Sequence, residues 1–247
     1  MKRLGLIGGT ALEHLALDEP RRRAVETPWG APSAPLTLGR LDGLDIVWLN
    51  RHGDHHRIPP HRVNYRANIA ALAAEGVDGV IALNAVGGIT PAMTPGSLVL
   101  PHQLIDYSWG RAQSFCDGDD QPVAHVDFTH PYDRDLRQGL LVAARGAGLA
   151  LVDGAVHGVV QGPRLETAAE IVRLERDGCD IVGMTGMPEA GLARERGIPY
   201  AALAVVVNPA AGKSDRLISL DEIGRVMAAA TPRLLALLGA FAAGAVG

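Results

Sequence analysis

Cysteine and surplus basic charge are both scarce in this chain of 247 residues. Cys116 and Cys179 are its only cysteines, too few for a disulfide framework, which indicates a reducing compartment. Lys and Arg number 23 against 27 Asp and Glu, and the resulting net charge of −4 argues against a nucleic-acid-binding surface. We therefore expect no nucleic acid among its partners.

Long uninterrupted apolar runs are also missing. The short apolar stretch that starts at Leu4 ends at Gly8-Gly9, too early for the core of a signal peptide. The Ala- and Leu-rich segment 225–247 is interrupted by charged residues and by Pro232, so its unbroken part is shorter than the roughly 20 residues of a membrane span. We interpret it as a packed terminal helix and expect a cytoplasmic protein with no membrane partner.

Nucleotide-binding motifs are absent as well. The opening G-L-I-G-G-T lacks the G-x-G-x-x-G spacing of a dinucleotide fingerprint, and nothing matches the P-loop pattern. The backbone N–H groups of such a turn and the hydroxyl of Thr10 suit an anion instead.

The segments that are present alternate between strand and helix patterns. Apolar runs closed by glycine or polar residues predict strands, and apolar residues at helical spacing predict helices. The expected strands are 4–7, 45–49, 77–83, 97–100, 149–160 (as one or two strands), 179–182 and 199–207, and the expected helices are 64–75, 133–147, 167–177, 188–196 and 220–239. This order predicts an α/β fold, a single domain over residues 1–247 with a mixed, mostly parallel central sheet flanked by helices.

Polar or small residues cluster just after the expected strands. Ligands of open α/β sheets bind outside the carboxyl ends of the strands, so these residues predict one shared pocket, although tight turns would leave the same pattern. The clusters are Gly8-Gly9-Thr10, Arg51-His52, Asn84-Ala85, Glu166, Met184-Thr185 and Asn208.

A histidine-rich loop follows the second expected strand, with three of the nine histidines in residues 51–57. A metal site, a solvated loop and an anion site are all compatible with it. No pair of histidines with helical H-x-x-x-H spacing precedes a second acidic ligand, and Gly53 and Pro59-Pro60 indicate a loop. We favour the anion site, because the Arg51 guanidinium can hold two oxygens of a phosphate.

Longer motifs resemble the trimeric purine nucleoside phosphorylase superfamily, on the branch that contains the methylthioadenosine phosphorylases. They run in the family's order from residue 5 to about residue 215 and read G-L-I-G-G-T, N-R-H-G-D-H-H-R-I-P-P-H-R-V-N-Y-R-A-N-I-A-A-L, R-A-Q-S-F-C-D-G, Q-G-P-R-L-E-T-A-A-E and M-T-G-M-P-E-A-G-L-A. The resemblance implies a pentosyltransferase of purine salvage, in which a nucleoside and phosphate give a free base and a pentose 1-phosphate. It also implies a homotrimer, and no metal or organic cofactor beyond phosphate as co-substrate.

The resemblance further assigns roles at the phosphate and sugar ends. Met184 would pack against the sugar and present its backbone to the 2′-hydroxyl, and His125 would reach the 5′ region of a neighbouring subunit. Positioning and electrostatics would carry catalysis, because the anomeric carbon becomes cationic beside the phosphate. The implied phosphate ligands are Thr10, Arg51, His52, Asn84, Ala85 and Thr185, with Arg51 and His52 also implied as catalytic.

The expected base site departs from the methylthioadenosine branch. That branch carries a serine after the phenylalanine of G-P-R-F and aspartates in D-Y-D, where this chain has Leu165-Glu166 and Asn208-Pro209-Ala210. The Glu and the Asn resemble those of phosphorylases that take inosine and guanosine. Glu166 can accept from N1–H of hypoxanthine, while Asn208 can donate to O6 and accept from a protonated N7, the leaving-group half of catalysis. Adenine would leave Glu166 facing an unprotonated N1.

Glu166 has a simpler interpretation, as a carboxylate that opens the helix after it.

The expected 5′ site is apolar. Leu220 stands where the family's inosine phosphorylases place a histidine, and leucine favours a methylthio group over a hydroxyl. The nucleoside that satisfies both ends is 5′-methylthioinosine, so we expect its phosphorolysis to hypoxanthine and 5-methylthioribose 1-phosphate.

Alternatives stay open. A 6-oxopurine (inosine and guanosine) nucleoside phosphorylase comes first and a methylthioadenosine phosphorylase second. A nucleosidase that uses water, a metal-dependent hydrolase and a non-catalytic ligand-binding domain are the other classes. The hydrolase would be built on His52, Asp54, His55 and His56.

Overall fold

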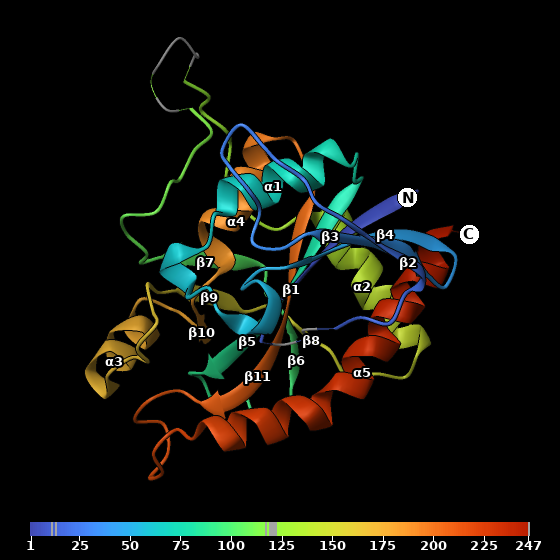
Figure 1. The fold of residues 1–247 in the computed structure, drawn as a ribbon. Coiled ribbons are helices and arrows are strands. Elements are labelled where there is room, and N and C mark those ends of the chain that lie inside the picture. The colour runs from blue at the N-terminus through green and yellow to red at the C-terminus, as the bar shows by residue number, and fades with distance from the viewer. Residues whose placement is uncertain (11, 13, 117, 119–122, 247) are drawn as a thin grey trace.

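The computed structural model describes residues 1–10, 12, 14–116, 118 and 123–246, and in it one sheet is covered by helices on both faces (Figure 1). The strands are β1 (Arg3–Gly8), β2 (Asp18–Arg23), β3 (Leu36–Leu41), β4 (Leu44–Asn50), β5 (Gly79–Gly88), β6 (Leu98–Leu100), β7 (Gln103–Asp106), β8 (Val152–Asp153), β9 (Val156–Val159), β10 (Ile181–Gly183) and β11 (Tyr200–Pro209). The helices are α1 (Tyr65–Ala74), α2 (Arg134–Gly146), α3 (Ala168–Arg176), α4 (Gly186–Glu195) and α5 (Leu220–Val246), with short 3₁₀ turns η1 (Asp54–His56) and η2 (Pro60–Arg62).

The sheet mixes parallel and antiparallel pairs, with the parallel ones in the majority. Its order is β2-β3-β4-β1-β5-β10-β9-β7, and a second branch runs from β5 through β11 and β6 to β8. Strand β1 pairs in parallel with β4 and β5, and β5 pairs in parallel with β11 over the whole of β11. The antiparallel pairs are β2–β3, β3–β4, β5–β10 and β6–β11. The expected α/β fold with a mixed, mostly parallel sheet is confirmed.

Two large apolar clusters fill the space between the sheet and its helices. On one face, α2 and α5 pack residues such as Leu140, Leu234 and Phe241 against the sheet, and on the other face α1 and α4 contribute Ile69 and Leu192. Helix α5 is long and apolar enough to cross a membrane by length and composition alone. Its buried residues belong to the first cluster, which agrees with a packed terminal helix.

Three strands were not expected from the sequence. Strand β2 reads D-E-P-R-R-R and is exposed along its whole length, so it carries none of the apolar alternation that indicates a strand. It forms because its backbone pairs with β3 at the edge of the sheet. Strands β3 and β7 are only partly buried, with weak apolar patterns of their own.

Two strands extend further than expected, which changes the local setting of the site. Asn84 and Ala85 were expected in a turn after a strand, but they lie inside β5, and Asn208 lies inside β11 rather than after it. The parallel ladder between β5 and β11 continues to the Gly88–Pro209 pair, so hydrogen bonding carries both strands past their last apolar residues. A register shift between Val206 and Asn208 marks a bulge, the kind of irregularity that re-aims a side chain.

Candidate active site

A cavity of about 590 Å³ opens where β1, β4, β5, β10 and β11 end. Pro59, Pro60 and Val207 contribute to its wall, together with the start of α5. The cavity is lined by these residues of the predicted site: Thr10, Arg51, His52, Asn84, Ala85, Leu165, Glu166, Met184, Thr185, Asn208 and Leu220. The structure therefore brings together side chains that the sequence spreads over more than two hundred positions.

Arg51 is buried at the inner end of the cavity and is held on two sides. Its Nε and Nη2 donate to the two carboxylate oxygens of Glu189, each at 2.8 Å, and its Nη1 donates to the Leu83 carbonyl at 3.0 Å. Burial alone would lower the pKa of Arg51, but the Glu189 carboxylate outweighs burial and holds that pKa above its usual value. The guanidinium therefore stays charged while its fork is occupied by protein rather than open to a ligand.

The glycine turn after β1 comes close to this guanidinium. A Cβ placed on Gly9 would lie 3.0 Å from Nη1 of Arg51 and 3.3 Å from the His52 ring. Any side chain at this position would crowd both residues, so glycine lets the turn that carries Thr10 approach them.

His52 is a neutral imidazole in this setting. Its Nδ1 lies 2.8 Å from the Ile58 carbonyl, which can only accept, so Nδ1 carries the proton and Nε2 keeps its lone pair. Burial first, and then the charge of Arg51, lower the pKa of His52 to about 4. At neutral pH His52 can accept a hydrogen bond from an oxygen ligand but contributes no positive charge.

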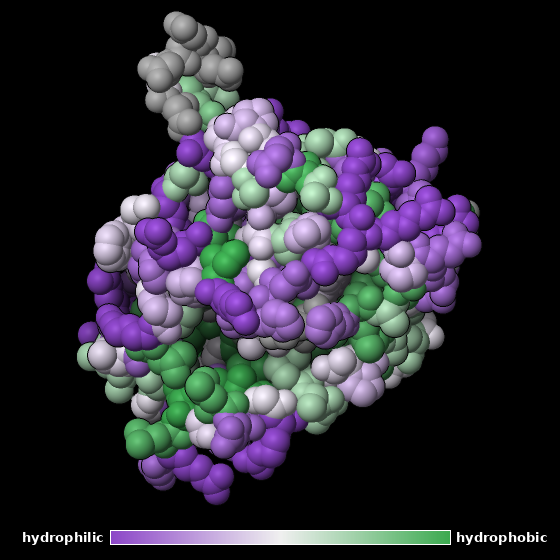
Figure 2. Space-filling model, viewed as in Figure 1, coloured by the Kyte–Doolittle hydropathy of each residue, from purple (hydrophilic) through white to green (hydrophobic). Residues whose placement is uncertain are grey.

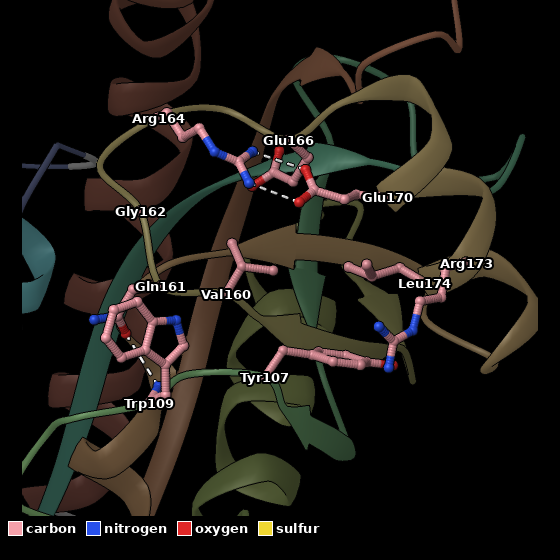
Figure 3. A pocket seen from close by; sticks show the side chains of 10 residues that line it. All are labelled: Tyr107, Trp109, Val160, Gln161, Gly162, Arg164, Glu166, Glu170, Arg173 and Leu174. Carbon is pink, nitrogen blue, oxygen red and sulfur yellow. Dashed lines mark hydrogen bonds and ion pairs between the residues drawn. The ribbon is translucent and has the colours of Figure 1, made fainter.

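One part of the cavity wall is formed by the loop between β9 and α3. Glu166 is half-buried there, and burial, followed by the charge of Glu170, raises its carboxyl pKa. Glu166 also lines a neighbouring pocket of about 400 Å³, where Figure 3 shows the Arg164–Glu170 ion pair beside it. Glu166 immediately precedes Thr167, the N-cap residue of α3, which agrees with its interpretation as a carboxylate of the N-cap region, but the capping box itself is formed by Thr167 and Glu170.

Asn208 lines the same cavity from β11. Its Nδ2 donates to the Pro209 carbonyl at 2.6 Å, which uses one of its two N–H groups. The other N–H group and the side-chain oxygen are left as a donor and an acceptor on one amide. A 6-oxopurine offers the complementary pair along its O6 and N7 edge when N7 is protonated, because O6 accepts and N7–H donates.

Met184 also lines the cavity, and its side chain lies against the loop that carries Gly162. A Cβ on Gly162 would come within 2.5 Å of the Met184 sulfur, and Gly162 has a φ of +61°, so this loop needs glycine on both counts. Leu220, at the start of α5, lines the mouth of the cavity but is 80% exposed in the single chain. Figure 2 shows apolar surface gathered over the lower left of the molecule, where α5 begins in Figure 1.

His125 and the histidine-loop ligands fall elsewhere. His125 is exposed and does not line the cavity of its own chain, and its expected role concerns a neighbouring subunit. Asp54, proposed as a ligand in the metal-site alternative, is engaged by Arg22 at 2.8 Å. Over the described ranges no three or more His, Cys, Asp or Glu side chains are grouped so that they could hold a metal ion.

Two residues that bear on the site were missed by sequence reasoning. Glu189 is completely buried against Arg51, yet in the sequence it is an ordinary acidic residue in the first turn of a helix. Arg111 is also buried, and it donates to the Met184 carbonyl at 2.9 Å and to the Gln161 carbonyl at 2.8 Å. Both lie inside motifs already quoted, which was the only signal available for them.

Known proteins resemble this chain over most of its length. A family model described as the phosphorylase superfamily matches residues 3–243. A probable S-methyl-5′-thioinosine phosphorylase of Xanthomonas campestris is 52% identical over 243 residues, 98% of this chain and 97% of its own. A 6-oxopurine nucleoside phosphorylase of Pyrococcus furiosus is 42% identical, over 92% of this chain and 87% of its own. The methylthioadenosine phosphorylase of Schistosoma mansoni in complex with adenine has a TM-score of 0.93 at 31% identity, covering 98% of this chain and 91% of that one.

Proposed function

Because the chain belongs to the phosphorylase superfamily, we propose that it cleaves S-methyl-5′-thioinosine with phosphate, giving hypoxanthine and 5-methylthioribose 1-phosphate. The observation that carries the proposal is the pairing of two chemistries in one cavity. Glu166 and Asn208 offer the hydrogen-bonding groups of a 6-oxopurine site, and Arg51 and Thr185, which line the same cavity, offer donors for an anion. The enzyme class is that of a pentosyltransferase.

At the anion end, phosphate would take hydrogen bonds from several neutral groups and one buried cation. Thr10, Asn84 and Thr185 supply hydroxyl and amide groups, and Arg51 supplies its remaining N–H donors. The neutral His52 Nε2 can accept a hydrogen bond from the O–H group of hydrogen phosphate. Such a set fixes the direction from which a phosphate oxygen meets the anomeric carbon, which is where most of the rate gain in this kind of substitution arises.

In the reaction, a phosphate oxygen forms a bond to C1′ as the C1′–N9 bond breaks and its electron pair passes to the purine. Hydrogen phosphate gives up its proton as it becomes the sugar ester, and the departing base gains one. Asn208 would accept from N7–H and donate to O6, so its amide would bind the leaving group better as the bond breaks. Glu166 would hold N1–H, a hydrogen that adenine lacks.

The 5′ end and the assembly complete the proposal. Leu220 and Ile223, both on α5, would cover a methylthio group, and Met184 would lie under the sugar. The exposure of Leu220 fits a site that is completed by a neighbouring subunit, to which His125 would belong in a homotrimer. We place the enzyme in the cytoplasm, with phosphate as co-substrate and no metal or organic cofactor.

The test is a substrate panel run with and without phosphate. Methylthioinosine, inosine, guanosine and methylthioadenosine are supplied at equal concentration, and release of the base is followed by chromatography. The expected result is cleavage only with phosphate and the highest kcat/KM for methylthioinosine. A chelator in a parallel series tests the metal-dependent hydrolase and is expected to change nothing.

Each other outcome points to a named alternative. Equal use of inosine would support a general 6-oxopurine phosphorylase, and preference for methylthioadenosine would overturn the base assignment. Cleavage without phosphate would support a nucleosidase, and no turnover of any nucleoside would support a ligand-binding domain.

A further inference from the structure

Glu189 is a buried carboxylate that accepts three hydrogen bonds. It takes no part in the proposed contacts with substrate. It lies on α4, is completely buried, and does not line the cavity. Arg51 gives it two bonds of 2.8 Å, and the Tyr200 hydroxyl donates a third, also of 2.8 Å, to Oε1. An ionised carboxylate in this position is fully satisfied, because the paired cation and the neutral hydroxyl together replace the water that it has lost.

The contacts of Arg51 show which of its N–H donors remain available for a ligand. A guanidinium has five N–H donors, and among the described residues three are used on Glu189 and the Leu83 carbonyl, which leaves two. Since Nε has one hydrogen and each terminal nitrogen has two, the remaining donors are one on Nη1 and one on Nη2. Nη1 is the nitrogen that lies against Gly9, in the turn that carries Thr10.

We propose that Glu189 is a positioning residue for phosphate: it fixes the plane of the Arg51 guanidinium so that the two remaining N–H groups meet the anion. This inference rests on the proposed phosphorolysis. Glu189 is the glutamate of the M-T-G-M-P-E motif, and the proposed contacts with the nucleoside do not use its carboxylate. The inference gives that carboxylate a function. The orientation comes from a two-point fork, since a single hydrogen bond would let the guanidinium rotate.

Two substitutions separate the charge of Glu189 from its reach. Glu189→Gln keeps the shape but replaces one acceptor oxygen by an NH₂ group, which faces a donor of Arg51. Glu189→Asp keeps the charge but withdraws the carboxylate by one methylene, about 1.5 Å, so that the fork cannot close at both points. Both changes leave the residues that line the cavity unaltered.

Glu75→Gln is the matched control. Glu75 is also a buried glutamate paired with an arginine, at 3.1 Å from Arg23, and it lies outside the cavity. The same chemical change is thus made at a second Arg–Glu pair that has no part in the site.

The experiment measures KM for phosphate and KM for methylthioinosine separately, with solubility and secondary structure checked for each variant. Both Glu189 variants are expected to raise the phosphate KM about tenfold or more while the nucleoside KM stays within about threefold of wild type. Glu75→Gln is expected to change neither constant. A purely structural role for Glu189 would move both constants together or neither, and either result overturns the inference.

A third variant covers the case in which neither Glu189 variant folds. Tyr200→Phe removes one donor to Oε1 and keeps the ion pair with Arg51, so it is expected to raise the phosphate KM about threefold without changing the nucleoside KM. An unchanged phosphate KM in that variant overturns the inference. An assay of the wild-type protein without phosphate distinguishes the two proposals. Cleavage without phosphate would overturn the proposed function. If the wild type requires phosphate and the variants keep its phosphate KM, only the role of Glu189 is overturned.

Discussion

The side-chain amide of Asn84 donates a 3.0 Å hydrogen bond to the hydroxyl oxygen of Thr185, a residue 101 positions further along the chain. Asn84 lies within β5 and Thr185 is the N-cap residue of α4, and both are buried at the inner end of the cavity. Because the Thr185 oxygen accepts from Asn84, its own proton is left to donate to a ligand. The pair therefore orients one hydroxyl donor toward the proposed phosphate.

Thr185→Val tests this orientation. The variant removes the donor and leaves the Asn84 amide buried without its partner, so we expect the phosphate KM to rise about tenfold and the free energy of unfolding to fall by about 1–3 kcal/mol. Steady-state kinetics and urea unfolding measure the two effects. Thr94→Val, at an exposed threonine that pairs with Ser97, is the control and is expected to alter neither. An unchanged phosphate KM in Thr185→Val would remove Thr185 from the anion site.

Asn208→Asp tests the base end. Aspartate cannot donate to O6, so we expect kcat/KM for methylthioinosine to fall about tenfold or more. The ratio between methylthioinosine and methylthioadenosine should shift toward the adenine nucleoside, whose amino group can donate to the new carboxylate. Asn64→Asp, at the N-cap of α1 outside the cavity, keeps a good capping oxygen and is expected to leave the selectivity unchanged. The same selectivity in both variants would exclude Asn208 from the base site.

Leu220→His tests the 5′ end. An imidazole can hydrogen-bond to a 5′-hydroxyl and covers a methylthio group less well, so we expect the kcat/KM ratio of inosine to methylthioinosine to rise about tenfold. Leu217→His is the matched control, because Leu217 is 94% exposed and does not line the cavity. If the two variants behave alike, the 5′ pocket is built by other residues.

His52 and His157 together predict how stability changes with pH. Burial, and then the charge of Arg51, lower both pKa values from 6.5 to about 4. Between these values the unfolded chain binds the protons that the folded chain excludes. Each histidine therefore contributes stability that is complete above pH 6.5 and is lost as the pH falls toward 4, at about 1.4 kcal/mol per pH unit.

His157→Gln isolates one of these contributions. His157 is completely buried, and its Nδ1 lies 3.3 Å from the Tyr132 hydroxyl, away from the cavity lining. Between pH 6 and pH 5, denaturant unfolding at one protein concentration should show a slope smaller than that of wild type by about 1.4 kcal/mol per pH unit. Equal slopes for the variant and wild type would mean that His157 titrates alike in the folded and unfolded chains.

Helices and strands could be predicted wherever their burial requires a recognisable pattern of apolar residues in the sequence. The near-continuous apolar run at 199–207 became the central strand β11, which is buried along almost its whole length. The same logic failed for β2, whose charged residues form a strand only through edge pairing with β3. Reasoning from apolar residues also predicted that the strand β5 ends at Leu83. That end is too early, because the ladder to β11 continues through polar residues.

Residue identities and their order along the chain determined the α/β fold class and a set of candidate site residues that meet in one cavity, because strand ends on one side of a sheet converge. They did not determine which partners those side chains bind in the folded protein. Arg51 was predicted to offer its fork to phosphate, but folding gives that fork to Glu189, 138 positions away. The buried charge of Arg51 is balanced by a carboxylate at hydrogen-bonding distance, and only the packing of α4 against the sheet decides which carboxylate arrives there.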